Sequence, residues 1–483
     1  MAEGARASRQ VRRARARRKE SVPKPFHLDR LAIPLLLAAG FFAYHNALHG
    51  PFVLDDIRAI SQNETIRTLW PPWGILSPPV HSPVTGRPLV NLSLAVNYAI
   101  GGERVTSYHL LNLAIHLLAA LALFGIIRRT LRDRAPRYRE EATGMATAAA
   151  LLWVVHPLTT ESVDYTIQRT ELLMGLFFLL TLYCAIRGFG PPERKNWYGA
   201  ALAAFVLGLG SKEVIVVAPA IVLVYDWLFE SASLRDALRR HWRLYAGYAA
   251  VLGLYVLFVG TRLRRAFTGL SGRAVAPWDY ALTQSAVIVH YLRLAFWPHP
   301  LAALVVLAVL GGWELLRRWE APRAARLAAA AALALSLALV TVRRNDDYRT
   351  VLGFWTDAVA KRPDSPRARL WLGYYLYKQG RNAEALRHET EAVRLQPENG
   401  EAQYSLGVVL TKFGRIDDAI HRFRQAVRIN PRYVEAHYNL AIALSRQGRK
   451  EQAAEHLETA IRLQPDFSPA RNALSNIRGG AIR

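Results

Sequence analysis

Cysteine is nearly absent from this chain of 483 residues, because Cys184 is the only one. A single thiol cannot form a disulfide within the chain, and it cannot supply the paired thiolates of a structural zinc site. Acidic residues are also scarce, with 37 Asp and Glu against 62 Lys and Arg. The histidine and acidic residues show no spacing typical of metal ligands, so the sequence predicts neither a metal nor another cofactor.

The formal charge of +25 would suit a nucleic-acid-binding protein, so the distribution of the charge decides its meaning. Eight Lys and Arg fall within the first 19 residues, and a long apolar run begins at Leu31. Basic residues recur in alternate connections between apolar runs, at 128–139, 187–195 and 235–243. This pattern predicts a cytoplasmic basic tail at 1–30, cytoplasmic loops and no nucleic-acid partner. A cleaved signal peptide is the weaker interpretation, since no small-residue cleavage site precedes the polar loop.

Long apolar runs dominate the first 343 residues, and hydrophobic residues make up 52% of the chain. Runs near the length that crosses a bilayer predict a multi-pass, all-α membrane domain at 31–343. Several runs are short enough to be re-entrant or buried within protein. The ten runs are 31–48, 107–127, 143–156, 170–186, 196–210, 213–229, 244–260, 282–297, 300–316 and 327–342.

After residue 343 the sequence becomes polar and repeats itself every 34 residues. The period is kept by Pro363, Pro397, Pro431 and Pro465, by Gly380, Gly414 and Gly448, by Leu372, Leu406 and Leu440, and by two sets of alanines. This spacing predicts an α-solenoid of tetratricopeptide repeats, with a linker and leading helix at 344–365, three repeats at 366–467 and a capping helix and tail at 468–483. Such solenoids usually bind a polypeptide, and the alternative is a module for dimerisation or scaffolding.

An acidic pair, Asp55 and Asp56, follows the first apolar run in "FVLDDIRAISQNETIRTLW" (52–70). A solvated loop or a helix N-cap is the simplest interpretation of these carboxylates. A carboxylate just outside the bilayer also suits a general base that acts on a substrate presented from the membrane. Transfer of a sugar from a polyprenyl-phosphate would need such a base, together with cations that hold the departing phosphate.

The other outward-facing loops supply further candidates for binding the donor. Lys212 and Glu213 interrupt an apolar stretch where ionisable groups are costly, so a functional role competes with a structural ion pair. Arg262, Arg264 and Arg265 lie outside against the charge rule, where they would bind a phosphate or anchor the chain at lipid headgroups. The segment "HPLTTESVDYTIQR" (156–169) adds four residues that would bind the sugar or hold the acidic pair in place. The histidine among them lies beside a proline, where a structural role is more common. These residues are His156, Glu161, Asp164 and Arg169.

Four stretches resemble the transmembrane and tetratricopeptide-repeat O-mannosyltransferase family, which has the C-type glycosyltransferase fold and is related to protein O-mannosyltransferases. They are "FVLDDIRAISQNETIRTLW", "GRPLVNLSLAVNYAIGGERVTSYHLLNLAIHLLAALALF", "LLWVVHPLTTESVDYTIQRTELLMGLFFLL" and "GSKEVIVVAPAIVLVYDWLF". The resemblance covers 31–300 in order and resumes over the repeats. It implies inverting transfer of a sugar, typically mannose, from a polyprenyl-phosphate carrier to a Ser or Thr hydroxyl on the non-cytoplasmic face.

Among single residues, the acidic pair carries the most specific resemblance. It implies that one of the two aspartates is the general base, and we favour Asp55. Arg87, His156, Glu161, Arg169, Lys212 and Glu213 lie in matching stretches, and their roles are hypotheses. After residue 300 the chain departs from the family, because sequence between hydrophobic segments is missing, as after an internal deletion. Ten crossings would return residue 343 to the cytoplasm, whereas the four arginines at 317–326 favour repeats on the outer side.

Two classes of function are therefore compatible with the sequence: a membrane glycosyltransferase and a non-catalytic membrane scaffold. A transporter is disfavoured, because the acidic pair lies in a loop and not in mid-membrane. The expected partners are a polyprenyl-phosphate sugar, membrane lipids and a polypeptide bound by the repeats, with a lipid or glycan as the other possible acceptor. Arginine outnumbers lysine 54 to 8, which favours a bacterial host, and hence the inner membrane with the active site facing outward.

Overall fold

The computed structural model describes residues 28–79, 82–190, 194–269 and 300–479. The regular secondary structure within these ranges is helical and contains no strand, so the predicted all-α fold class is confirmed. The chain divides into two compact units, Met1–Asn345 and Asp346–Arg483, which are described separately below. The predicted apolar span at 282–297 lies outside the described residues, as does the basic tail up to residue 27.

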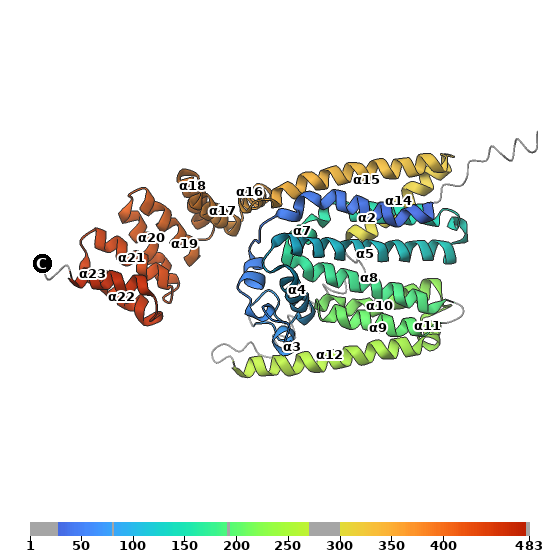
Figure 1. The fold of residues 1–483 in the computed structure, drawn as a ribbon, viewed down its shortest axis with the longest axis horizontal. Coiled ribbons are helices and arrows are strands. Elements are labelled where there is room, and N and C mark those ends of the chain that lie inside the picture. Colours follow the sequence, from blue (N-terminus) through green and yellow to red (C-terminus); the bar gives the residue numbers. More distant parts are fainter. Residues whose placement is uncertain (1–27, 80–81, 191–193, 270–299, 480–483) are drawn as a thin grey trace, which may run out of the picture. The chain divides into compact units, whose positions relative to one another are not determined.

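The first unit is built from long apolar helices that lie side by side (Figure 1). The long helix α5 packs against α2, α6 and α8, and α8 packs most extensively against α9. The helices are α2 (Leu28–Tyr44), α3 (Pro72–Leu76), α4 (Pro88–Gly101), α5 (Val105–Arg134), α6 (Ala142–Val154), α7 (Thr160–Asp164), α8 (Arg169–Phe189), α9 (Asn196–Leu209), α10 (Ala218–Phe229), α11 (Leu234–Arg240), α12 (Trp242–Gly269), α14 (Pro300–Arg318) and α15 (Arg323–Asn345).

Small residues allow these helices to approach closely. A Cβ atom on Gly125 of α5 would lie 2.7 Å from the ring of Tyr183 in α8, and one on Gly247 of α12 would lie 2.7 Å from Leu202 in α9. Because a real Cβ needs more room, a larger residue at either position would require the facing side chain to move. The glycines therefore leave room for Tyr183 and Leu202 between the helices.

Fewer helices qualify as membrane spans than the ten apolar runs predicted. In the described part of the chain four helices are long and apolar enough to cross a bilayer, or six if each bent pair forms one span. The run at 143–156 is not a straight span, because α6 ends at Val154 and the chain bends by 49° into α7. The run at 213–229 likewise continues into α11 through a bend of 108°. Apolar length alone does not reveal such breaks.

The ends of three apolar helices meet on one side of the first unit. The Asn345 amide at the end of α15 donates to the Ala43 carbonyl of α2 at 2.8 Å, and the Thr341 hydroxyl donates to the Val155 carbonyl at 2.7 Å. At the other end of α15, Arg326 pairs with Glu141 at 2.8 Å, beside the arginine-rich connection between α5 and α6. The chain therefore leaves this unit at Asn345, on the side where α2 ends and the loop with Asp55 begins.

The second unit consists of antiparallel helix pairs that stack in sequence order. Gly380, Gly414 and Gly448 end the first helix of each pair with φ of +78°, +71° and +78°, a conformation that favours glycine. The helices are α16 (Val351–Lys361), α17 (Pro366–Lys378), α18 (Asn382–Leu395), α19 (Gly400–Lys412), α20 (Ile416–Ile429), α21 (Val434–Arg446), α22 (Lys450–Leu463) and α23 (Ser468–Gly479).

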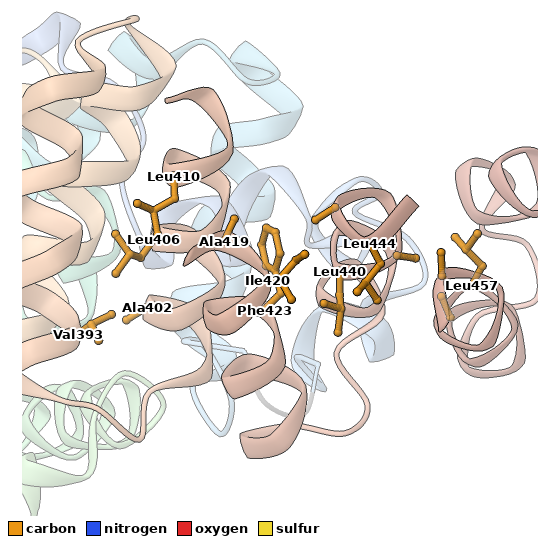
Figure 2. Packing of buried hydrophobic residues seen from close by; sticks show 14 of the residues in the cluster. Val393, Ala402, Leu406, Leu410, Ala419, Ile420, Phe423, Leu440, Leu444 and Leu457 are labelled. Carbon is orange, nitrogen blue, oxygen red and sulfur yellow. The ribbon is translucent and has the colours of Figure 1, made fainter. Parts of the chain in front are cut away.

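A continuous apolar core runs through this stack, and Figure 2 shows side chains of α18 to α22 meeting in it. Phe423 packs beneath Gly407, where a Cβ atom would lie 2.6 Å from its ring. Residues 34 before and after Phe423 are Glu389 and Leu457, and all three side chains are buried. Glu389 is thus a carboxyl group at a core position, and only its Oε1 is bonded, to the Ser405 hydroxyl at 2.6 Å.

Candidate functional site

The two aspartates of the acidic pair lie in different surroundings. Asp55 lines a cavity of about 380 Å³ in the first unit. Asp56 is 1% exposed, and its carboxylate accepts hydrogen bonds from the backbone N–H groups of Val53 at 3.1 Å and Ile167 at 2.7 Å. Leu54, just before the pair, has a φ of +49°, which is strained for a branched side chain. The strained turn and the anchored Asp56 together place Asp55 at the cavity.

Asp56 connects two loops that lie far apart in the sequence. Burial raises the pKa of Asp56 to about 7, against the lowering effect of its backbone hydrogen bonds and of the positive charge of Arg169. The Asp55 backbone N–H also donates to the Tyr165 hydroxyl at 3.1 Å, in the segment that Asp56 holds through Ile167. The loop that contains Asp55 and Asp56 and the segment 165–167 are therefore fixed to each other.

Arg169 supports this region from inside the helix bundle. Its side chain is fully buried and donates to the Asn112 side chain at 2.8 Å, to the Tyr108 carbonyl at 3.0 Å and to the Ser93 carbonyl at 3.2 Å. These partners belong to α4 and α5, so Arg169 joins both helices to the start of α8. From the sequence, Arg169 is expected to bind the sugar or to hold the acidic pair in place. In the structure its side chain does not line the cavity.

The cavity combines carboxylates, cations and neutral hydrogen-bonding groups. Arg87 lines it at the start of α4, and its Nη1 donates to the Pro83 carbonyl at 3.0 Å. Glu171 lines it from the first turn of α8, and its carboxylate is paired with Lys212. The complete lining is Asp55, Ser82, Pro83, Thr85, Arg87, Tyr165, Ile167, Gln168, Thr170 and Glu171. Two acids and two cations therefore lie in or beside one polar cavity.

The partner of Lys212 differs from the one that the sequence suggested. The structural alternative at 212–213 was an ion pair between neighbours, but Lys212 pairs with Glu171, which is 41 residues earlier in the chain. Glu213 is exposed and does not line the cavity. The pair joins the first turn of α8 to the turn that follows α9, and it brings the Lys212 charge to the edge of the cavity.

The other predicted site residues lie elsewhere. His156 accepts a hydrogen bond from the Leu158 backbone N–H at 3.2 Å, so its ring caps the turn between α6 and α7. Glu161 is exposed on α7, away from the cavity lining. Asp164 is buried, and neither of its carboxylate oxygens has a hydrogen-bond partner among the described residues. Arg262, Arg264 and Arg265 lie in the last turns of α12, beyond the part whose side chains are described.

Eight of the ten residues that line the cavity were not singled out from the sequence, among them Tyr165, Gln168 and Glu171. Glu171 carried the same signal as Lys212, because it is an ionisable group at the start of a long apolar run. Tyr165 and Gln168 gave no such signal, since neutral polar residues are ordinary at a loop between helices. Within the described ranges no group of three or more His, Cys, Asp or Glu side chains is placed to hold a metal ion.

Comparison with known proteins addresses both units. Residues 81–259 match the family described as dolichyl-phosphate-mannose-protein mannosyltransferase. Residues 354–400, 376–415 and 410–477 match tetratricopeptide-repeat families. The predicted family resemblance is confirmed. The matched membrane segment includes Arg87, Glu171 and Lys212, whereas Asp55 and Asp56 precede it.

The curated relatives are named protein O-mannosyl-transferases. Protein O-mannosyl-transferase TMTC3 of Homo sapiens is 28% identical over 204 residues, which are 40% of this chain and 21% of that protein. Protein O-mannosyl-transferase TMTC2 of Homo sapiens is 32% identical over 203 residues, 39% of this chain and 23% of that protein. The aligned region thus spans less than a quarter of the length of either relative.

Solved structures match part of the chain only. "Crystal structure of MamA" aligns at 22% identity with a TM-score of 0.27, covering 29% of this chain and 80% of that one. "First TPR of Spaghetti (RPAP3) bound to HSP90 peptide SRMEEVD" aligns at 21% identity with a TM-score of 0.24, covering 24% and 94%.

Proposed function

We propose that this protein is an integral-membrane glycosyltransferase that moves a sugar, mannose, from a polyprenyl-phosphate carrier to a hydroxyl group on the outer side of the membrane. The acceptor hydroxyl belongs to a Ser or Thr residue of a polypeptide. The observation that carries the proposal is the polar cavity that places the Asp55 carboxylate together with Arg87 and the Glu171–Lys212 pair. The match of residues 81–259 to a mannosyltransferase family supports the choice of sugar and donor.

Asp55 acts as the general base in this proposal. Its carboxylate takes the proton of the acceptor hydroxyl while the hydroxyl oxygen forms a bond to the anomeric carbon of the sugar. The bond between that carbon and the phosphate oxygen breaks, and its electron pair leaves with the phosphate. Because the acceptor attacks from the face opposite the phosphate, the configuration at the anomeric carbon is inverted.

Arg87 and Lys212 neutralise the charge that develops on the departing phosphate. Lys212 is paired with Glu171 in the structure, so an incoming phosphate competes with the Glu171 carboxylate for the same ammonium group. Once released, Glu171 is an acceptor for a sugar hydroxyl, as are the side chains of Gln168 and Tyr165. A cavity of about 380 Å³ has room for a hexose phosphate and an acceptor side chain.

The orientation follows from the charge pattern and from the side on which helices end. With the basic tail in the cytoplasm, α2 ends on the outer side, and the loop with Asp55 and the end of α15 lie there as well. The second unit, which contains the repeats, begins at the next residue, so the repeats belong to the compartment in which transfer takes place. We assign the protein to the bacterial plasma membrane as a multi-pass protein.

Sugar transfer in membranes that contain this chain tests the proposal. Labelled polyprenyl-phosphate-mannose is supplied to wild type, to Asp55→Asn and to Glu161→Gln, a matched control because Glu161 is an exposed carboxylate outside the cavity. We expect label on protein with wild type and the control, and a loss of about 10²- to 10⁴-fold with Asp55→Asn. Equal transfer by all three proteins would refute the role of Asp55, and would favour a non-catalytic scaffold if transfer also persists without the chain.

A further inference from the structure

A buried carboxyl group lies where the first two repeats meet. The Glu389 side chain of α18 is fully buried, although the equivalent residues of the next two repeats, Phe423 and Leu457, are apolar. Gly373 of α17 makes room for it, since a Cβ atom there would lie 2.8 Å from the Glu389 Cγ. Gly407 and Phe423 meet in the same way one repeat later. The carboxyl group therefore takes the place of a core side chain.

The bonding of Glu389 links two repeats. Its Oε1 accepts a hydrogen bond from the Ser405 hydroxyl of α19 at 2.6 Å, and this bond crosses from the first repeat to the second. Its Oε2 is buried and has no hydrogen-bond partner among the described residues. Because a carboxylate can accept several hydrogen bonds, an ionised Glu389 would be buried with most of this capacity unused. A neutral carboxyl group loses much less hydration in the same place.

The charges around Glu389 do not compensate its ionised form. Burial raises the pKa of Glu389 to about 8, the Ser405 hydrogen bond opposes this shift, and the negative charge of Glu401 on α19 adds to it. On α17 the guanidinium of Arg369 lies beside the His388 ring of α18, with Nη1 and Nδ1 3.5 Å apart. No Lys or Arg in the described part of the chain bonds either oxygen of Glu389.

The corresponding contact between the second and third repeats contains no such carboxyl group. In place of Glu389 and Ser405 it has Phe423 and Asn439, and the Asn439 amide donates to the Tyr404 hydroxyl at 2.8 Å. Neither phenylalanine nor asparagine has a side chain that titrates. We call the contact of α18 with α19 the Glu389 joint and that of α20 with α21 the Phe423 joint. The two joints are equivalent in the repeat pattern and differ in their response to protons.

The dependence on pH follows from the two states of the Glu389 joint. While the joint is closed, the raised pKa lets Glu389 keep its proton up to about pH 8. When the joint opens, water solvates the carboxyl group and its pKa returns to the usual 4.5. The closed state is therefore most stable below pH 4.5, and its equilibrium constant falls about tenfold for each pH unit between pH 4.5 and 8.

We propose that the Glu389 joint is a proton-controlled hinge, which is closed when Glu389 carries a proton and opens when the carboxylate is exposed to water. The Phe423 joint stays closed under the same conditions. Opening separates the first repeat from the second while the later repeats stay folded, so the solenoid bends at the Glu389 joint. The hinge does not depend on sugar transfer, so it holds or fails separately from the proposed function.

Hydrogen–deuterium exchange of the full chain in detergent, read by mass spectrometry at pH 6 and pH 8, tests the hinge. Protection factors are compared, because they remove the intrinsic dependence of amide exchange on pH. The proteins are wild type, Glu389→Gln, which keeps the size of the side chain without its charge, and Glu384→Gln. The last is a matched control, because Glu384 is an exposed carboxylate on the same helix. Glu389→Leu, with the side chain found at the equivalent Leu457, gives the same comparison if Glu389→Gln does not fold.

In wild type and Glu384→Gln we expect the protection factors of α18 and α19 to fall by about 10- to 100-fold from pH 6 to pH 8. Those of α20 and α21 should change by less than about threefold. In Glu389→Gln neither joint should respond to pH. An equal fall at both joints of wild type would show that the whole unit loosens, and would overturn the hinge. The same fall in Glu389→Gln, or no fall in wild type, would overturn it as well.

Discussion

Replacing Asp55 or Asp56 by alanine distinguishes the two proposed roles, in which Asp55 reacts with the acceptor and Asp56 holds Asp55 in position. In Asp56→Ala the backbone N–H groups of Val53 and Ile167 both lose their acceptor in a buried place. Each unsatisfied buried donor costs about 1–3 kcal/mol, so the free energy of unfolding should fall by about 2–6 kcal/mol. In Asp55→Ala no side-chain hydrogen bond is lost within the described residues, and the change should stay within about 0.5 kcal/mol.

The pH dependence of this difference has a defined sign. Burial raises the pKa of Asp56 to about 7 from a usual value of 3.8, so the folded state holds this proton more tightly than the unfolded chain does. The contribution of Asp56 to stability is therefore full below pH 3.8 and declines by about 1.4 kcal/mol per pH unit up to pH 7. The stability gap between wild type and Asp56→Ala should be wider at pH 5 than at pH 8.

The assay measures unfolding and transfer on the same purified proteins. Thermal unfolding in detergent at pH 5 and pH 8 gives the stability of each variant, and labelled mannose on protein gives its activity. Asp55→Ala should keep its unfolding midpoint and lose transfer by about 10²- to 10⁴-fold. A midpoint lowered as much by Asp55→Ala as by Asp56→Ala, or a gap that widens towards pH 8, would refute the assignment of roles.

Three further variants test other parts of the structure. Arg169→Lys removes the fork that reaches Asn112 and two carbonyls, so we expect a lower unfolding midpoint by thermal scanning; an unchanged midpoint would contradict its bracing role. Lys212→Ala should raise KM for the lipid-linked donor several-fold and leave KM for the acceptor unchanged, and the opposite pattern would argue against phosphate binding. Burial raises the pKa of Glu389 to about 8, so wild type should lose about 1.4 kcal/mol per pH unit between pH 4.5 and 8, and Glu389→Gln should lack this slope in unfolding scans; an equal slope would refute it.

Part of the candidate site could be predicted from the sequence because its signals are local. An acidic pair after an apolar run, and Lys212 within one, stand out where charges are costly. Glu171 could have been found by the same argument. The contrast between Asp55 and Asp56 could not, because it depends on the backbone N–H of Ile167, which is 111 residues from Asp56.

The number of membrane spans shows where an apolar pattern stops being informative. Hydropathy locates runs such as 143–156 and 213–229, but it does not show that the chain bends at their ends by 49° and 108°. Bends depend on local hydrogen bonds, such as the cap that His156 gives to Leu158. The structure also places Asn345, at the end of α15, beside the end of α2, and no count of runs contains this contact.

The sequence by itself determined the helical class, the membrane character of the first unit and the repeats of the second. Each of these features depends on residues that are close in the sequence. The 34-residue period repeats one local packing unit, and Gly380, Gly414 and Gly448 occupy turns with positive φ. Only the tertiary structure decided which aspartate lines the cavity and that Lys212 pairs with Glu171. These features arise where segments distant in the chain come together, and close packing then gives each side chain one set of neighbours.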